Sequence, residues 1–372
     1  MWKKILIVAG LLAVVAGGGI LIHRMPPSEL DLKQDTIWSS SIISNRVVVP
    51  AGVTLTIQPG ATVLFRPRAG LLIRGRLVAE GMDTQRIRMA REREPFYLWA
   101  GLAFEDSQQD NRLVNVDIEA AGSEGHYVRL LRSRVMIERA RFFGAQNNVI
   151  VAEDSSLVLR GSLVDAVGAH EVLRVWRTPA GGEFLVASNT FYPNFGYNDI
   201  VDLTDCRSPG AVPRFIGNTF LGGGDDGLDI DNSEAYIEGN TFIHFNLKGH
   251  KKYSDAISAA RQSRLVVTNN LFACNDQAVA AMGGAHARLL NNTFFRNRDA
   301  AVVFKERANT PGGAVIENCL FRENGASFAF AELATELIVS NSILPEADRW
   351  PGQGNASVGQ SGGATIAYDG AY

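Results

Sequence analysis

Three short acidic segments follow one another in the middle of the chain. They are residues 198–203 (NDIVDL), 224–231 (GDDGLDID) and 254–258 (SDAIS), and residues 249–252 (GHKK) precede the third. Carboxylates and histidine are the usual proton donors and acceptors of enzymes. Carboxylates about 5 Å apart repel each other, so a cluster of them requires a shared proton, a bound cation or a nearby lysine. If the fold stacks these segments, they predict an acid–base site or a cation site.

A phrase of the form Asn-x-Phe recurs through the second half of the chain and indicates how the chain folds. Its full copies carry Asn189, Asn218, Asn240, Asn270 and Asn292, and weaker echoes carry Asn318 and Asn341. Successive copies are 22–30 residues apart. A period of this size is typical of a solenoid, because one such turn is too small to bury its own apolar face. We expect each Phe inside the solenoid and each Asn in a ladder at a corner.

Counting from each repeat asparagine aligns the acidic segments with one another. Leu228 and Ile230 are apolar, so they are expected to point inward and to leave Asp229 on the outer face. The same alternation places Asp231 outward and makes Asp202 the neighbour of Asp229 on the preceding turn. A second column at the strand starts would contain Asp199, Asp226 and Asp255, extended by Asp276 and Asp299.

The remainder of the chain is typical of short strands separated by turns. Residues 47–49 (VVV) and 53–57 (VTLTI), for example, are β-branched or apolar and flank a Pro-Ala-Gly turn. Strands interrupted about every 8–12 residues, without helical periodicity, predict an all-β fold. We expect one solenoid domain over residues 37–344, of about a dozen turns and about 60 Å in length. Residues 25–36 are predicted to be a linker, and residues 345–372 a C-terminal cap or flexible tail.

The opening segment from Ile37 to about Ala90 and the Asn-x-Phe copies resemble the right-handed parallel β-helix proteins of the pectin-lyase-like superfamily. The resemblance covers nearly all of residues 37–344 and implies a single-stranded right-handed parallel β-helix. It does not specify function, because that scaffold carries lyases, hydrolases, epimerases, adhesins and inert envelope proteins.

The acidic segments also resemble the groove of polygalacturonase-type glycosidases, in which an Asp, a Gly-Asp-Asp and a Gly-His lie on successive turns. Asp202, residues 224–226 and residues 249–250 occur in that order here. The resemblance implies that Asp202, Asp225 and Asp226 supply the acid and the base and that His250 orients them. The Arg-x-Lys of that family is missing. To this set we add Asp229 as a catalytic candidate, and the substrate-binding candidates are Lys251, Lys252, Asp255 and Lys305.

Two other interpretations of the acidic segments remain open. Asp226 and Asp255 could cap turns through Asx hydrogen bonds while Asp229 and Asp231 are solvated. Alternatively, the carboxylate oxygens could bind Ca²⁺. The sequence predicts no other metal site and no organic cofactor.

The N-terminus predicts export from the cytoplasm. Lys3 and Lys4 precede residues 5–22, which carry no charge, and His23 and Arg24 follow. Eighteen apolar residues just reach the length that spans a bilayer. We expect an inner-membrane signal anchor through residues 5–22 with a periplasmic domain. A cleaved signal peptide and a secreted protein are the alternative.

Charge and cysteine content narrow the other possibilities. The net charge of −3 gives no reason to expect a nucleic-acid partner. The cysteines Cys206, Cys274 and Cys319 are odd in number and lack metal-ligand spacing, which predicts packing thiols. Arginines spaced two apart at residues 66–68, 74–76, 86–88 and 91–93 could form either a basic strip or ion pairs with Glu80, Glu92 and Glu94.

These patterns lead to two predictions of function. The first is a hydrolase or lyase that acts on an acidic or cell-envelope polysaccharide through the stacked carboxylates. The second is a non-catalytic glycan-binding or scaffolding protein of the bacterial envelope.

Overall fold

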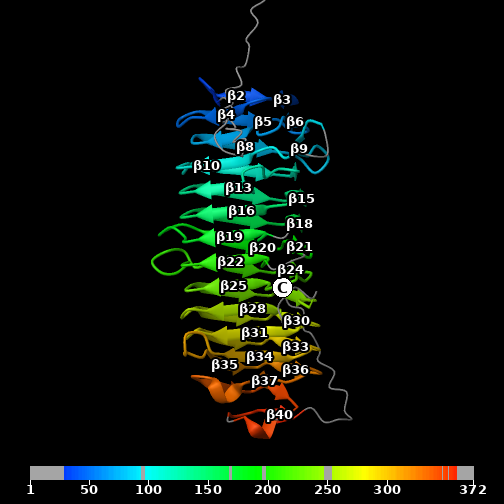
Figure 1. Cartoon of the computed structure of the whole chain (residues 1–372), viewed down its shortest axis with the longest axis vertical. Coiled ribbons are helices and arrows are strands. Elements are labelled where there is room, and N and C mark those ends of the chain that lie inside the picture. The colour runs from blue at the N-terminus through cyan, green and yellow to red at the C-terminus, as the bar shows by residue number, and fades with distance from the viewer. Residues whose placement is uncertain are drawn as a thin grey trace, which may run out of the picture.

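The computed structural model is a column of stacked turns, in which the N-terminal turns lie at one end and the C-terminal turns at the other (Figure 1). It describes residues 29–93, 97–166, 170–194, 198–246, 254–345, 347–350 and 352–357. Each turn contributes one strand to each of three parallel sheets, which contain 13, 13 and 14 strands. At about 4.8 Å per turn, thirteen turns extend for about 60 Å.

Sheet A carries the predicted site residues Asp202 and Asp229. Its strands, in spatial order, are β1 (Glu29–Asp31), β4 (Arg46–Val49), β7 (Gly70–Ile73), β10 (Gly101–Glu105), β13 (His126–Leu131), β16 (Asn148–Glu153), β19 (Leu173–Trp176), β22 (Val201–Thr204), β25 (Leu228–Asp231), β28 (Asp255–Ala260), β31 (Gln277–Met282), β34 (Ala300–Lys305) and β37 (Phe328–Ala329).

Sheet B follows sheet A within each turn. Its strands are β2 (Thr36–Trp38), β5 (Thr54–Ile57), β8 (Arg76–Glu80), β11 (Asn111–Val114), β14 (Arg134–Glu138), β17 (Ser156–Arg160), β20 (Phe184–Ala187), β23 (Arg214–Ile216), β26 (Glu234–Glu238), β29 (Arg264–Thr268), β32 (His286–Leu290), β35 (Gly313–Glu317) and β38 (Leu337–Ser340).

Sheet C completes each turn. Its strands are β3 (Ser41–Ile43), β6 (Thr62–Phe65), β9 (Ile87–Arg91), β12 (Val116–Glu119), β15 (Arg141–Ala145), β18 (Leu163–Ala166), β21 (Thr190–Phe191), β24 (Thr219–Phe220), β27 (Thr241–Ile243), β30 (Leu271–Ala273), β33 (Thr293–Phe295), β36 (Leu320–Arg322), β39 (Ile343–Leu344) and β40 (Ala356–Ser357). Two short 3₁₀ helices, η1 (Ala331–Leu333) and η2 (Ala347–Arg349), lie near the C-terminal end.

The ends of the column extend beyond the predicted domain. Strand β1 pairs with β4, so the first turn begins at Glu29, within the stretch predicted to be a linker. Strand β40 pairs with β39 and lies within the stretch predicted to be a cap or tail. The predicted membrane segment, residues 5–22, lies outside the described residues. Within the part of the chain that the structure describes, no helix is long and apolar enough to cross a membrane.

The repeated phenylalanines form a stack in the core, as predicted. Phe220, Phe242 and Phe272 lie on successive strands of sheet C, and their rings are parallel to within 6°. Their centroids are 4.7 and 5.0 Å apart, which is the strand spacing itself. Identical side chains at one rung position therefore bury a continuous apolar column.

The repeated asparagines form a buried ladder at the corner before sheet C. The Asn218 side-chain amide donates to Oδ1 of Asn240 at 2.9 Å, and that of Asn240 donates to Oδ1 of Asn270 at 3.0 Å. In the two weaker copies of the phrase, the predicted ladder residues Asn318 and Asn341 are wrong. The backbone amide of Asn292 donates to Sγ of Cys319, and that of Cys319 donates to Oγ of Ser342. The ladder therefore continues through Cys319 and Ser342.

Asn318 and Asn341 themselves adopt left-handed backbone conformations, with φ of 54° and 48°. Asparagine tolerates this conformation well, which explains its presence just before the ladder position. A second ladder, which the sequence analysis missed, runs through Asn275, Asn297 and Asn324 at another corner, with side-chain hydrogen bonds of 3.0 and 2.8 Å.

We expect Asn240→Ala to lower the free energy of unfolding by roughly 1–3 kcal/mol, because the buried backbone N–H of Asn218 and one of its side-chain N–H groups lose their acceptor. Urea unfolding followed by circular dichroism measures this change. Asn318→Gly is the matched control, since that position lies beside the ladder, and we expect a change within about 0.5 kcal/mol. Equal losses in the two variants would contradict the ladder assignment.

The cysteines form no disulfide, and the paired arginines mostly form ion pairs rather than one basic strip. All three cysteines are free thiols, and Cys206 and Cys319 are buried.

Most of the predicted arginine pairs form ion pairs, such as Arg66 with Glu92 at 3.0 Å and Arg86 with Asp117 at 2.7 Å. Residues 74–76 lie where sheet A meets sheet B, whereas the other three pairs lie on or beside β6 and β9 of sheet C, so the four pairs do not build one basic strip. Glu80 pairs with Arg112 rather than with a member of these pairs.

Candidate functional site

The outer face of sheet A carries the predicted pair of carboxylates. Asp202 of β22 lies directly opposite Asp229 of β25, and Ser258 of β28 follows in the same column. Arg174 of β19 precedes Asp202. The flanking aliphatic residues of each strand are buried in the core, whereas both aspartates are half-buried on the outside. The register predicted from the sequence is confirmed for this pair.

The second acidic column lies at the corner where each turn enters sheet A. Oδ1 of Asp199 accepts the backbone amide of Asp226 at 3.0 Å, and Oδ1 of Asp226 accepts that of Asp255 at 3.0 Å. Asp226 was predicted to cap a turn through a local Asx hydrogen bond, but its hydrogen bond spans 29 residues and joins two successive turns. Gly227 is required here, because a Cβ atom would lie 2.5 Å from the carbonyl oxygen of Ala256.

The predicted extension of this column is wrong by one residue. Asp255 lies opposite Gln277, and Gln277 lies opposite Ala300. Asp276 instead forms an ion pair with Arg298 at 2.9 Å. The turns before β31 and β34 enter the sheet in a different register, which spacing between aspartates does not reveal.

Asp199, Asp225 and Asp226 form a compact acidic cluster in which carboxylate oxygens of all three lie within 4.8 Å of one another. Asp225 and Asp226 are buried. Burial, followed by the charges of the neighbouring aspartates Asp226, Asp229 and Asp225, raises the pKa of Asp199 to about 10. The cluster therefore retains a proton at neutral pH. Its oxygens are also of the kind that Ca²⁺ prefers, although three carboxylates supply fewer ligands than the usual six to eight.

We expect Asp199→Asn to raise Tm at pH 8 and to change it little at pH 4. Above pH 4 the unfolded chain releases this proton while the folded chain keeps it, so stability falls as pH rises, and asparagine removes that penalty. Thermal unfolding in EDTA measures the effect, and the exposed Asp83→Asn serves as control. A Tm of the native protein that rises with added Ca²⁺, and a variant that lacks this rise, would instead support the calcium interpretation.

Asp202 is reachable from solvent yet lies in a restricted environment. Its side chain is 19% exposed, and Oδ2 lies 3.5 Å from Nε of Arg174. The Thr204 hydroxyl donates to Oδ1 at 3.2 Å. Burial raises the pKa of Asp202, and this effect outweighs the lowering by Arg174 and by the Thr204 hydrogen bond. Asp202 is therefore a better proton donor near neutral pH than an ordinary aspartate.

Cations neutralise two other carboxylates of sheet A, Asp231 at the end of β25 and Asp255 at the start of β28. Asp231 was expected to be solvated, but it is buried and contacts Arg261 and Arg307, each at 3.1 Å. Lys305 Nζ lies 2.9 Å from Asp255. The two candidate substrate-binding residues Asp255 and Lys305 are thus brought together, although 50 residues separate them in sequence.

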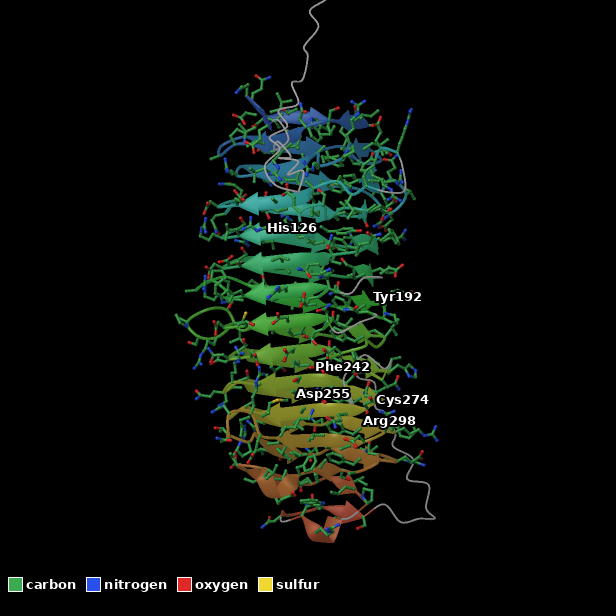
Figure 2. The ribbon with its side chains drawn as sticks, in the orientation of Figure 1. His126, Tyr192, Phe242, Asp255, Cys274 and Arg298 are labelled. Atoms are coloured by element: carbon green, nitrogen blue, oxygen red, sulfur yellow. The ribbon has the colours of Figure 1, made fainter. Side chains whose placement is uncertain are left out.

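The remaining predicted residues cannot be placed in the site. His250, Lys251 and Lys252 lie outside the described residues. His126 is buried several turns away from Asp255 along the axis, and burial lowers its pKa (Figure 2). Of the predicted set, the described structure brings Asp225, Asp226, Asp202 and Asp229 onto two adjacent turns.

Sequence reasoning missed two functional candidates on β19. Arg174 and Trp176 alternate with buried Leu173 and Val175 and therefore face outward beside β22. Together with residues of β16 and β22, they line a cavity of about 430 Å³ that includes Asp202. The alternation was visible in the sequence, but its position next to Asp202 follows only from the register of the turns.

Comparison with known proteins supports the fold. Residues 200–368 match the family model described as the right-handed β-helix region. The predicted right-handed parallel β-helix is therefore confirmed. No curated protein matches the chain.

Three solved structures are similar to this chain over most of its length. They are the catalytic domain of a GH87 α-1,3-glucanase in complex with tetrasaccharides (12% identity, TM-score 0.39), tailspike protein 3 of bacteriophage CBA120 (12%, 0.32) and the A-module of a mannuronan C-5 epimerase of Azotobacter vinelandii (14%, 0.35). The alignments cover 89%, 89% and 90% of this chain. They span 64% of the glucanase, 55% of the tailspike protein and 90% of the epimerase module.

Proposed function

We propose that this right-handed parallel β-helix is an enzyme that cleaves an acidic or cell-envelope polysaccharide, as a hydrolase or a lyase. The observation that carries the proposal is the pairing of Asp202 and Asp229 on adjacent rungs of an outer sheet face. A long, straight face formed by thirteen parallel strands is also a suitable surface for an extended polymer.

The spacing of the pair suits acid–base catalysis. Adjacent parallel strands lie about 4.8 Å apart, close to the carboxylate separation of about 5–5.5 Å in retaining glycosidases. We assign the proton donor to Asp202, whose pKa is raised by burial. Asp229, which lies opposite it, would act as nucleophile in hydrolysis or as base in elimination.

The buried cluster plays a supporting part in this proposal. Asp225 and Asp226 lie on the same turn as Asp229, and their negative charge favours the protonated form of neighbouring carboxyls. His250, Lys251 and Lys252 would contact the substrate from the segment before β28. Alternatively, a Ca²⁺ ion bound to the acidic cluster would compensate its negative charge in place of the retained proton.

The proposed location follows from the N-terminal sequence. Residues 5–22 would anchor the protein in the bacterial inner membrane and place the β-helix in the periplasm, where envelope polysaccharides occur.

The proposal is tested by incubating the full-length protein with a panel of acidic and neutral polysaccharides. New reducing ends without unsaturated sugars indicate hydrolysis, and unsaturated ends indicate elimination. Binding without cleavage across the whole panel would contradict the enzyme assignment and favour a non-catalytic glycan-binding or scaffolding protein. The backbone amide of Asp255 donates a hydrogen bond to Asp226, which gives this carboxylate a structural role without catalysis. This observation favours the second candidate.

A further inference from the structure

Trp176 is an unusual residue for the outer face of a solenoid. Its side chain projects from the end of β19, and the residue is 46% exposed. Among the tryptophans that the structure describes, it alone is exposed, whereas Trp99 is fully buried. Its exposed face and its N–H group give the indole both an apolar surface and a hydrogen-bond donor that a ligand can contact.

The orientation of the indole ring is held in place. Its Nε1 lies 3.3 Å from Oδ2 of Asp205. The guanidinium carbon of Arg177 lies 4.2 Å from the ring centroid. Arg177 in turn makes two hydrogen bonds of 2.9 Å to the carboxylate of Asp154. A ring fixed in this way loses little conformational entropy when a ligand stacks on it.

The space beside Trp176 is suitable for a small ring. Trp176 lines the cavity of about 430 Å³ together with Arg174, Asp202 and Thr204. This volume lies within the range of roughly 300–1,000 Å³ that is typical of small-molecule sites. The polar lining comes from strands rather than loops, so its geometry is preformed.

Arg174 supplies a positive charge at the same place. It lies two residues before Trp176 on the same face of β19. Its side chain is 56% exposed, and its ion pair with Asp202 is long, at 3.5 Å through Nε. Guanidinium groups carry five N–H donors and bind carboxylates in a bidentate manner.

We propose that Trp176 and Arg174 form a binding subsite for a uronic acid residue, in which the pyranose ring stacks on the indole and its carboxylate binds the guanidinium. The inference rests on the proposed function for the polymer and narrows its substrate class to uronate-containing chains. The subsite adjoins Asp202, so the bound sugar lies next to the bond that is cleaved.

Occupation of this subsite has a consequence for the proton donor. Arg174 lowers the pKa of Asp202 in the free protein. A uronate carboxylate that engages Arg174 competes with Asp202 for its positive charge and adds a negative charge nearby. Both effects favour the protonated form of Asp202. Substrate binding thus favours protonation of Asp202, which is the acid that the cleavage step requires.

The test uses the full-length protein and oligomers of galacturonate, mannuronate, guluronate and glucuronate, with a neutral oligomer of equal length for comparison. Binding is followed by tryptophan fluorescence and isothermal titration calorimetry. We expect Trp176→Ala to weaken binding of both classes at least about tenfold, because stacking does not depend on the carboxylate. We expect Arg174→Gln to weaken binding of the uronate oligomer about tenfold and to leave the neutral oligomer unaffected.

Two variants serve as matched controls. Tyr192→Ala removes an exposed aromatic ring beyond β21 in sheet C, and Arg214→Gln removes an exposed arginine on sheet B. Both should bind as the native protein does. Figure 2 shows Tyr192 at the edge of the column.

The outcomes separate this inference from the proposed catalysis. Native affinity in both Trp176→Ala and Arg174→Gln would overturn the subsite, even if cleavage continues. Failure of every uronate oligomer to bind would overturn it as well. Binding that depends on Trp176 and Arg174, in a protein that cleaves nothing, would support the subsite while the proposed catalysis fails.

Discussion

Asp229→Asn is expected to lower turnover of a uronate polymer by about 10²- to 10⁴-fold, the range typical for loss of an acid–base group. Asp202→Asn should have an effect of similar size, since the two residues act as a pair on adjacent rungs. Neither substitution should lower Tm, because asparagine keeps the shape and relieves repulsion between two carboxylates. Initial rates at saturating polymer, together with thermal unfolding, measure both quantities.

Asp231→Asn is the matched control for this experiment. It lies two residues after Asp229 on the same strand, but its carboxylate is held by Arg261 and Arg307. We therefore expect a small loss of stability and native turnover. If Asp231→Asn lowered turnover as much as Asp229→Asn, the effect would belong to the whole acidic face rather than to the proposed pair.

The pH profile of kcat provides a second check on Asp202. A proton donor is active only while protonated, so kcat should decline as pH rises through its pKa, which burial places above that of an ordinary aspartate. The alkaline limb should disappear from the residual activity of Asp202→Asn. Persistence of the same limb in the variant would assign it to another group.

Phe242→Ala is expected to lower the free energy of unfolding by about 3–5 kcal/mol, the usual loss for a buried phenylalanine. Phe242 is fully buried and stacks between Phe220 and Phe272, with centroid distances of 4.7 and 5.0 Å. Alanine would leave a cavity that neither neighbour can fill, because each ring is held by its own turn. Urea denaturation followed by circular dichroism measures the loss.

Two further variants make this stability prediction specific. Phe242→Leu retains part of the volume and should cost less than Phe242→Ala. Tyr192→Ala removes a half-exposed ring of comparable size and should change stability by less than about 1 kcal/mol. A loss below about 1 kcal/mol in Phe242→Ala would show that the stack contributes little to the cohesion of the turns.

The repeated phrase allowed the solenoid and part of the site to be predicted from the sequence. Its spacing aligned Asp202 with Asp229, and the structure has this register. The same spacing failed at Asn318 and Asn341, where the ladder passes through the following residue. A side chain can occupy either of two neighbouring corner positions with similar chemistry, so composition alone does not distinguish them.

The electrostatics of the site could not be predicted in the same way. Asp231 looked solvated because it alternates with buried residues, yet Arg307, 76 residues away, contacts it. The proton held by Asp199 likewise depends on burial and on carboxylates from a different turn. Charge–charge effects depend on distance and dielectric environment, and neither is encoded in spacing along a single strand.

Local alternation and the repeat period were sufficient to establish a stacked β-helix, its core column and the outward direction of Asp202 and Asp229. These features depend on the geometry of one strand and on the length of one turn, which are local properties. The tertiary structure alone decided which outward side chains meet, which carboxylates are buried and which cations reach them. Those relations join residues from different turns, and loops of unequal length between the strands set their register.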